Sequence, residues 1–507
     1  MADAKRLAKN TLYMYARMIL IMIVSIYTSR VVLDKLGVDD YGLYNAVASI
    51  VAMITFLNIT LSTSTSRYLT YDLGQGNYEK LRRTFSTSFY SHLILAGIVL
   101  LVMETVGLWY MFNKFVIPEG REMATHVVFQ ISILTTVIAV IQVPYTATIM
   151  AHENMDVYAY VGIFEVIAKL TIAYLLVLTS FDHLIFYAFL VALVQVSVTL
   201  IYYIVSRLKY SETQLVQHFD KETFRGMMGF TGWTAVANLS STILVQGATV
   251  LLNLFFASAI ITSKALANQV TNAVMQFVNN FRVALNPQII KSYASGEMTE
   301  FKRWSLRSTI ITSDLMLIIG LPCVVCTKTI LKIWLVEVPQ LAVEFTQLAI
   351  ISQFIHAISS STYIPFVASG RLKLNAVWGV VVSVTYFVLA YVIFKIGGGA
   401  LWVQWLYIGV AFVSILILRP VLLHKEVNFT YREVFLCTLE CFKPIVLAGI
   451  VAWGISLIFD ESLWQQVLLF ALIFIETCVA VWLCLEKQIK LYVLKMIESR
   501  LRKIYLK

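Results

Sequence analysis

The sequence predicts an all-α polytopic membrane protein with about 14 transmembrane helices, arranged as two parallel six-helix lobes around a central cavity plus a C-terminal helix pair. Three observations support this fold class. Hydrophobic residues make up 59% of the 507-residue chain and charged residues only 13%, against about 25% charged in soluble domains. The apolar residues form long runs separated by short charged segments. Several features also recur once along the chain.

The apolar runs have the length of transmembrane helices, each of which needs about 20 apolar residues. Their continuity, as in Leu93 to Met103, excludes the alternating segments of a transmembrane β-barrel. The run from Leu12 to Val32 has no small-residue cleavage site, so we expect it to be retained as the first helix. The expected spans are 10–33, 41–66, 84–112, 125–150, 157–179, 184–206, 230–256, 263–288, 306–328, 344–368, 375–395, 400–418, 445–460 and 465–486.

The distribution of Lys and Arg predicts that both termini are cytoplasmic. In that orientation 28 of the 39 basic residues lie in cytoplasmic segments, 7 in outer loops and 4 inside helices, as the positive-inside rule requires. The net charge of +10 is therefore largely a topology signal, and the basic tail is expected to contact membrane lipid headgroups. Nucleic-acid binding is not expected, because no soluble binding module is present.

Three short features recur and indicate an internal repeat. They recur at offsets of 223, 220 and 221 residues, as Asn45 with Asn268, Gly76 with Gly296, and Pro144 with Pro365. Six expected helices separate the members of each pair, so both copies share one orientation, and an axis along the membrane normal relates them. The expected domains are an N-terminal lobe at 1–206, a C-terminal lobe at 207–424, and residues 425–507 with two additional helices and a basic cytoplasmic tail.

Polar residues form stripes on three expected helices. A substrate cavity between two lobes would be lined by such stripes, because polar groups that face lipid are unfavourable. Spacings of three and four residues place each stripe on one helical face. The stripes are Asn238, Thr242, Gln246, Thr249 and Asn253; Asn268, Asn272, Gln276 and Asn279; and Thr55, Asn58, Ser62 and Ser66. The substrate-binding candidates are Gln246, Asn253, Asn268, Asn272, Gln276 and Asn279. The alternative is that these side chains hydrogen-bond between helices and hold the bundle together.

Two arginines lie in the cytoplasmic half of the expected spans. Arg17 is about two turns into the first helix, and Arg282 follows Asn279 by three residues on the same face. Two guanidinium groups that face a cavity suit a phosphate or pyrophosphate, which each can hold bidentately. The alternative is that each side chain extends to the cytoplasmic headgroups.

The intramembrane acids leave the coupling ion open. Glu165 and Lys169 are one turn apart and can neutralise each other. Glu104, Asp314 and Glu476 are lone acids in apolar stretches. Each could couple transport to H+ or Na+, and the sequence does not single one out.

The residues most often used in catalysis show no catalytic arrangement. Cys323 and Cys326 form a CxxC without further metal ligands, so they are expected to be structural thiols, and His356 is expected to be a core residue. No nucleotide-binding loop or nucleophile constellation is found. We therefore expect no catalytic residues, no cofactor and no metal, and a protein that is not an enzyme.

Four short motifs resemble those of a known family. The segment 36–44, which reads LGVDDYGLY, resembles the "LG…YG.Y" signature of bacterial polysaccharide flippases of the O-antigen type. The other motifs are similar to segments of the same proteins and lie at 143–155, at Asn286-Pro287 and at 369–373. These flippases belong to the multidrug/oligosaccharidyl-lipid/polysaccharide exporter superfamily, which also contains lipid II flippases and drug exporters.

The resemblance implies a cavity lined mainly by the first, second, seventh and eighth helices, and alternating access of that cavity to the two faces of the membrane. The implied substrate is a polyprenyl-pyrophosphate-linked oligosaccharide, moved across the bacterial cytoplasmic (inner) membrane for surface polysaccharide or lipopolysaccharide biosynthesis. The implied partners are glycosyltransferases and a glycan polymerase. Fourteen helices resemble the lipid II branch, in which the extra pair lines a lipid groove.

The sequence leaves two other functions open. A cation-coupled multidrug exporter of the same superfamily would need acidic and aromatic cavity residues, whereas the charges at 17 and 282 are basic. A membrane-embedded glycan polymerase or transferase would need a large loop with catalytic residues. The longest connecting segments, at 207–229 and 419–444, lack such a constellation.

Overall fold

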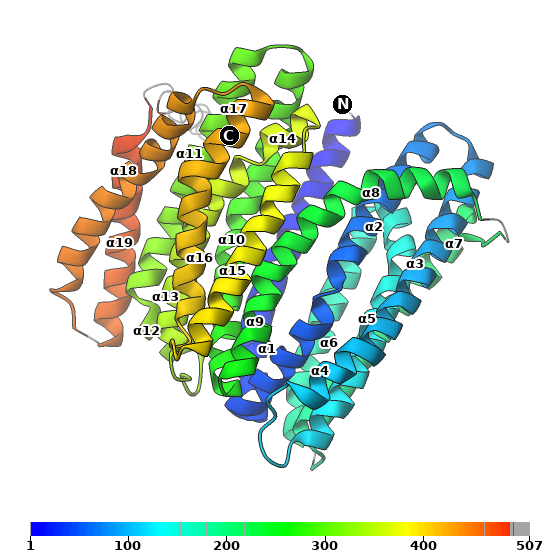
Figure 1. Ribbon diagram of the computed structural model, residues 1–507, viewed down its shortest axis with the longest axis horizontal. Coiled ribbons are helices and arrows are strands. Elements are labelled where there is room, and N and C mark those ends of the chain that lie inside the picture. Colours follow the sequence, from blue (N-terminus) through cyan, green and yellow to red (C-terminus); the bar gives the residue numbers. More distant parts are fainter. Residues whose placement is uncertain are drawn as a thin grey trace, which may run out of the picture. The chain divides into compact units, whose positions relative to one another are not determined.

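The computed structural model describes residues 2–152, 154–178, 180–216, 219–460, 462–486 and 490, although the side chains of residues 2–18 and of scattered helical positions lie outside the described part. The described chain is built from helices and turns, without β-strands (Figure 1). Ten of its helices are long and apolar enough to cross a membrane. The prediction of an all-α polytopic membrane protein is confirmed. By chain contacts the molecule divides into two compact units, which are described separately.

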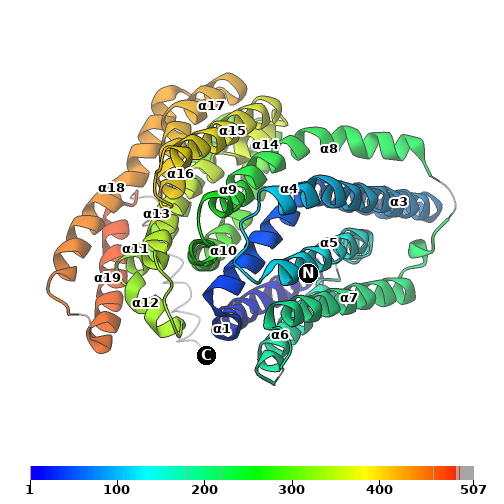
Figure 2. The same cartoon turned by 60° about the horizontal axis from the view of Figure 1, so that its bottom comes forward.

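The first unit contains residues 1–266, 334–342 and 373–403. Within it, α3, α5 and α7 pack side by side, and α1 packs on α6 (Figure 2). Helix α8 packs on α2 and α15. A core of buried side chains that includes Leu69, Phe85 and Tyr145 joins α2, α3 and α5. The helices are α1 (Ala2–Ala52), α2 (Thr55–Gly74), α3 (Tyr78–Val102), η1 (Met103–Gly107), α4 (Leu108–Asn113), α5 (Glu122–Ala151), α6 (Met155–Leu178), α7 (His183–Lys209), η2 (Ser211–Thr213), α8 (Lys221–Thr242), η3 (Ile243–Gly247), α9 (Ala248–Phe255) and α15 (Lys373–Lys395).

The second unit contains residues 267–333, 343–372 and 404–507. In it, α11, α18 and α19 pack against one another as three neighbouring helices (Figure 1). The C-terminal helix pair is thus anchored on α11. The helices of this unit are α10 (Ser258–Ala294), whose first residues belong to the first unit, α11 (Met298–Val325), α12 (Thr327–Trp334), α13 (Ala342–Ser361), α14 (Ile364–Ser369), α16 (Trp402–Val413), η4 (Ser414–Leu418), α17 (Arg419–Val427), α18 (Tyr431–Ser456) and α19 (Leu463–Cys484). The lobe boundaries drawn from the repeat stay a prediction.

The expected connection between the first two spans is shorter than predicted. Two helical segments of α1 meet at a kink at Gly37, whose φ of 79° and ψ of 169° are not helical, and the second segment runs to Ala52. Glycine adopts this left-handed conformation without a Cβ clash. Asp39 and Asp40 then lie in the first turn of the continuing helix, where the helix dipole favours acidic residues. The expected span 41–66 is instead interrupted by a turn at Met53 and Ile54.

Two of the expected spans are longer in the structure than predicted. The span 400–418 continues through η4 and α17 to Val427. The span 445–460 begins earlier, as α18, because Thr430 and Glu433 form a reciprocal capping box at its start. The added segments, 419–427 and 431–444, contain charged residues, and the sequence therefore predicted a loop there.

Candidate anion-binding site

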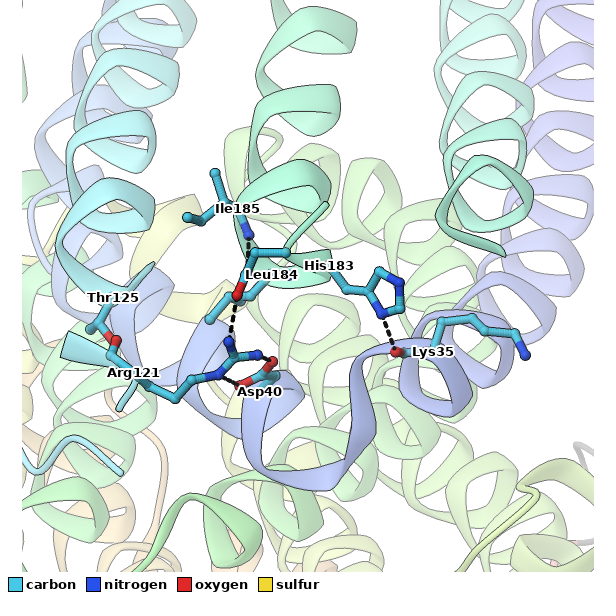
Figure 3. Close-up of polar contacts among 8 residues, drawn as sticks. Lys35, Asp40, Arg121, Thr125, His183, Leu184 and Ile185 are labelled. Atoms are coloured by element: carbon cyan, nitrogen blue, oxygen red, sulfur yellow. Dashed lines mark hydrogen bonds and ion pairs between the residues drawn. The ribbon is translucent and has the colours of Figure 1, made fainter. Parts of the chain in front are cut away.

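The "LG…YG.Y" motif has a structural explanation in the first unit. Arg121 at the start of α5 donates through its Nε to Asp40 at 2.8 Å and also binds the Asp182 carboxylate (Figure 3). The other oxygen of Asp182 caps α7 by accepting hydrogen bonds from the backbone N–H groups of Leu184 and Ile185. One arginine therefore connects α1, α5 and the N-terminus of α7. Both carboxylates are already bound by Arg121, so we interpret this cluster as a structural clamp, that is, an ion-pair cluster that holds the three helices together.

The electrostatics of Asp182 agree with this role. Burial acts to raise the pKa of Asp182, but the backbone N–H groups of Ile185 and Leu184 and the guanidinium of Arg121 outweigh burial and lower the pKa below its ordinary value. A carboxylate that accepts several hydrogen bonds and faces a cation is stabilised in its charged form.

Gly42 of the motif permits a close helix approach. A Cβ at this position would overlap the carbonyl oxygen of Ser258 and the hydroxyl of Thr262, at the start of α10. Thr262 in turn donates to the carbonyl of Val38 at 2.5 Å. The motif thus fixes the start of α10 against α1 within the first unit.

The residues of the predicted polar stripe at 238–253 have different surroundings in the structure. Asn253 is 1% exposed, and its amide both donates to and accepts from the backbone of Val116, at 3.2 and 3.3 Å. Asn238 donates to Thr60 at 3.0 Å. Both residues therefore hold the first unit together, as in the alternative reading of the stripes. Gln246 lies partly exposed in the π-helical turn η3, a kind of irregularity that often occurs at functional sites.

The stripe on α10 lies in the second unit. Asn272 is exposed, and Asn268, Gln276 and Asn279 are partly buried. The side-chain oxygens of Gln276 and Asn279 are buried and have no hydrogen-bond partner among the described residues. Buried amide oxygens are normally satisfied by protein or water. These two acceptors are therefore unsatisfied among the described residues in this conformation.

Two arginines of the second unit meet consecutive residues of α13. Arg282 of α10 donates from Nη1 to the hydroxyl of Ser360 at 2.5 Å. Arg419, the first residue of α17, donates from Nε to the hydroxyl of Ser359 at 3.1 Å. Both guanidinium groups act electrostatically on His356, one turn earlier on α13. We call Arg282, Arg419, Ser359, Ser360 and His356 the cationic cluster.

The cationic cluster has the charge of an anion site. Arg282 forms no ion pair with a carboxylate of the described chain, and its hydrogen-bonded partner is a neutral hydroxyl. Charged side chains at membrane depth usually pair or mark a substrate pathway. Arginine can hold a phosphate through two parallel hydrogen bonds. Two such groups on adjacent serines can therefore bind an anion with more than one negative charge.

The sequence did not reveal Arg419 as a site residue. The apolar run ends at Leu418, so Arg419 was counted with the cytoplasmic segment that follows. In the structure it lies inside the continuous helical span Trp402–Val427. The available signals were the Arg-Pro pair at 419–420, which suits a helix N-terminus, and the short length of the expected span.

The predicted partner of Arg282 was Arg17, whose side chain lies outside the described residues. Its role stays a prediction. The structure instead brings Arg282 together with Arg419, because α13 presents serines to both α10 and α17.

No family model matches the chain, and no curated protein matches its sequence. Solved structures do match its fold. The lipid II flippase MurJ in an inward-closed conformation aligns with a TM-score of 0.66 over 93% of this chain and 98% of that chain, at 12% identity. An inward-facing multidrug resistance transporter of the MATE family aligns at 0.64 over 79% of this chain and 96% of that chain, at 14% identity. A superfamily transporter from Pyrococcus furiosus aligns at 0.55, over 80% and 94%, at 13% identity. The chain therefore has the fold of these multi-pass membrane transporters and flippases.

Proposed function

We propose that the chain is a flippase that moves a polyprenyl-pyrophosphate-linked oligosaccharide across the bacterial cytoplasmic membrane, by alternating access, for surface polysaccharide biosynthesis. The observation that supports this most is the cationic cluster. Arg282 and Arg419 place two positive charges on Ser360 and Ser359 in the second unit. A pyrophosphate carries the complementary charge and the oxygens that guanidinium groups bind bidentately.

The amides of α10 extend this assignment to the sugar. Gln276 and Asn279 precede Arg282 by six and three residues on the same helix. Their buried oxygens accept no hydrogen bond from the described chain. Sugar hydroxyls are donors, so an oligosaccharide attached to a bound pyrophosphate can satisfy these oxygens in the conformation that exposes them. Asn268 and Asn272 would continue this surface. The polyprenyl chain would stay in the lipid.

The fold comparison supports a lipid-linked substrate. The lipid II flippase aligns over 93% of the chain, an extent that must include part of the terminal helices. We propose that both termini are cytoplasmic, that glycosyltransferases supply the substrate and that a polymerase receives it.

A cation-coupled drug exporter is the second candidate, because a MATE transporter aligns at a TM-score of 0.64. The cationic cluster opposes that function for cationic drugs, since like charges repel in a medium of low dielectric constant.

The test is flipping of a fluorescent polyprenyl-pyrophosphate oligosaccharide in proteoliposomes. Arg282→Glu should abolish flipping while the protein still inserts and purifies. The control is Arg303→Glu, because Arg303 pairs with Glu300 on the exposed surface of α11 and should keep activity. Normal flipping by Arg282→Glu, or flipping of a cationic dye in preference to the lipid, would contradict the proposal.

A further inference from the structure

The structure distinguishes the acids that lie within the membrane spans. Glu165 pairs with Lys169 at 2.6 Å, and Glu104 accepts a hydrogen bond from Gln130 at 3.2 Å. Glu476 keeps part of its side chain exposed, although one of its oxygens is buried without a partner. Asp314 differs from all of these. It is 5% exposed, and its buried Oδ1 has no hydrogen-bond partner in the described chain.

Asp314 faces the C-terminal helix pair. Residues seven apart lie on one face of a helix, and both neighbours of Asp314 at that spacing contact the pair. Arg307 reaches Glu486, directly after α19, at 2.8 Å. Leu321 packs on an apolar cluster formed by Cys326 with residues of α18 and α19. Asp314 lies between these two contacts on the same side of α11.

Two contacts fix the depth of Asp314. Cys326 donates to the carbonyl of Gln466 at one end of the α11–α19 pair, and Arg307 binds Glu486 at the other. Asp314 is seven residues from Arg307 along α11, which is about 10 Å at the rise of an α-helix. The carboxyl group therefore lies inside the helix bundle, away from both of its ends.

Among the described residues, the groups on the helices packed against Asp314 form no ion pair with it. On α18 the buried Cys437 and Cys441 are thiols, and Lys443 pairs with Glu440 on its own helix. On α19 the acid is Glu476, and Cys484 is close enough to interact electrostatically with Asp314. Other described charges of this unit have partners of their own. Arg307 binds Glu486, Lys490 donates to the carbonyl of Leu483, and His356 of α13 lies beside Arg282 and Arg419.

We propose that Asp314 is a reversible proton-binding site that couples transport to a proton gradient. An ionised carboxylate without a counter-ion is strongly disfavoured in an apolar interior, and it becomes neutral by taking up a proton. One proton from solution binds one carboxylate oxygen while the bundle is closed around Asp314. The proton leaves when water reaches the carboxyl group.

Proton binding is tested on the wild-type protein with dicyclohexylcarbodiimide, a membrane-soluble reagent that adds to protonated carboxyl groups. Mass spectrometry of the digested protein should show the adduct on the peptide that contains Asp314 under mildly acidic conditions. The yield should fall as the buffer becomes alkaline, and Asp314→Asn should lose the adduct. The Glu104 peptide in the same sample is the internal reference. An unmodified Asp314 peptide at every pH, or a yield that does not depend on pH, would overturn the proposal.

Coupling rests on the proposed transport function, whereas proton binding does not. In proteoliposomes with an imposed pH gradient, the wild-type protein should flip the labelled lipid faster than it does without the gradient. Asp314→Asn should lose this acceleration, and Glu104→Gln should keep it. If no variant flips the lipid, the proposed substrate fails while the carbodiimide result still reports on the proton site. If Asp314→Asn keeps the full acceleration, the coupling role of Asp314 is wrong.

Discussion

Ser359 and Ser360 are consecutive residues of α13, and each accepts a hydrogen bond from a different arginine, Arg419 and Arg282 respectively. Side chains of consecutive helical residues point about 100° apart, so the two hydroxyls face different neighbouring helices. This places two guanidinium groups, from α17 and α10, around one turn of α13. The serines therefore position the charges without neutralising them.

Removal of one serine hydroxyl should weaken substrate binding. Ser360→Ala frees Arg282 to change its orientation and removes a hydrogen bond to a charged group, so the KM for the lipid-linked substrate should rise about tenfold. Flipping rates at varied substrate concentration measure this. Ser456→Ala, which removes an exposed hydroxyl on α18, serves as the control. An unchanged KM in Ser360→Ala would show that the serine does not position the arginine.

Arg121→Gln should destabilise the first unit. The substitution leaves the buried Asp40 and the partly exposed Asp182 without their shared cation, at a cost of about 2 kcal/mol given the partial exposure of the cluster. Thermal unfolding in detergent measures the loss. Arg83→Gln removes only an exposed pair with Glu79 and should change stability by about 0.5 kcal/mol or less. Equal effects of the two substitutions would be inconsistent with a structural clamp.

Asp182 should make stability depend on pH in the acid range. Its pKa in the folded protein is lowered, below the value of about 3.9 expected in the unfolded chain. The stabilisation is therefore complete above the unfolded pKa and is lost as the pH falls through the folded pKa. Melting temperatures measured from neutral to acidic pH should fall less steeply for Asp182→Asn than for the wild type. Parallel curves would argue against this assignment.

Gly42→Ala should disrupt the contact between α1 and the start of α10. Its Cβ would overlap backbone atoms of Ser258, so the helices would have to separate, and we expect a loss of about 1 to 3 kcal/mol. Gly449→Ala on α18 is the matched control, since its Cβ would meet open space and alanine favours a helix by up to about 1 kcal/mol. Melting temperatures should move in opposite directions. A Gly42→Ala variant as stable as the wild type would refute the close approach.

The sequence predicted what depends on local composition. Continuous apolar runs were enough to give the helices and the polytopic class, because each span must satisfy its own backbone in lipid. The 3.6-residue period placed Gln276, Asn279 and Arg282 on one face of α10. It could not show that Asn253 binds the backbone of Val116, because that contact joins residues 137 positions apart.

The rest depended on tertiary packing. Arg419 reaches Ser359 only because α17 packs near the end of α13. In the sequence, Arg419 directly follows the apolar run that ends at Leu418, so it was predicted to lie in a loop. Asp314 could not be separated from Glu104 and Glu476 by sequence, because the three differ in their surroundings and not in their local pattern. The place of α18 and α19 against α11 was likewise not encoded in any motif.

The most direct test of the central claim is binding of polyprenyl pyrophosphate and polyprenyl monophosphate to the purified protein, measured by native mass spectrometry with wild type and Arg282→Gln/Arg419→Gln. If the cationic cluster holds the pyrophosphate, the wild type should prefer pyrophosphate, and the double variant should lose about a hundredfold in affinity for it. Its affinity for the monophosphate should fall less. Equal binding of the two lipids by the wild type, or unchanged pyrophosphate binding by the double variant, would contradict the account.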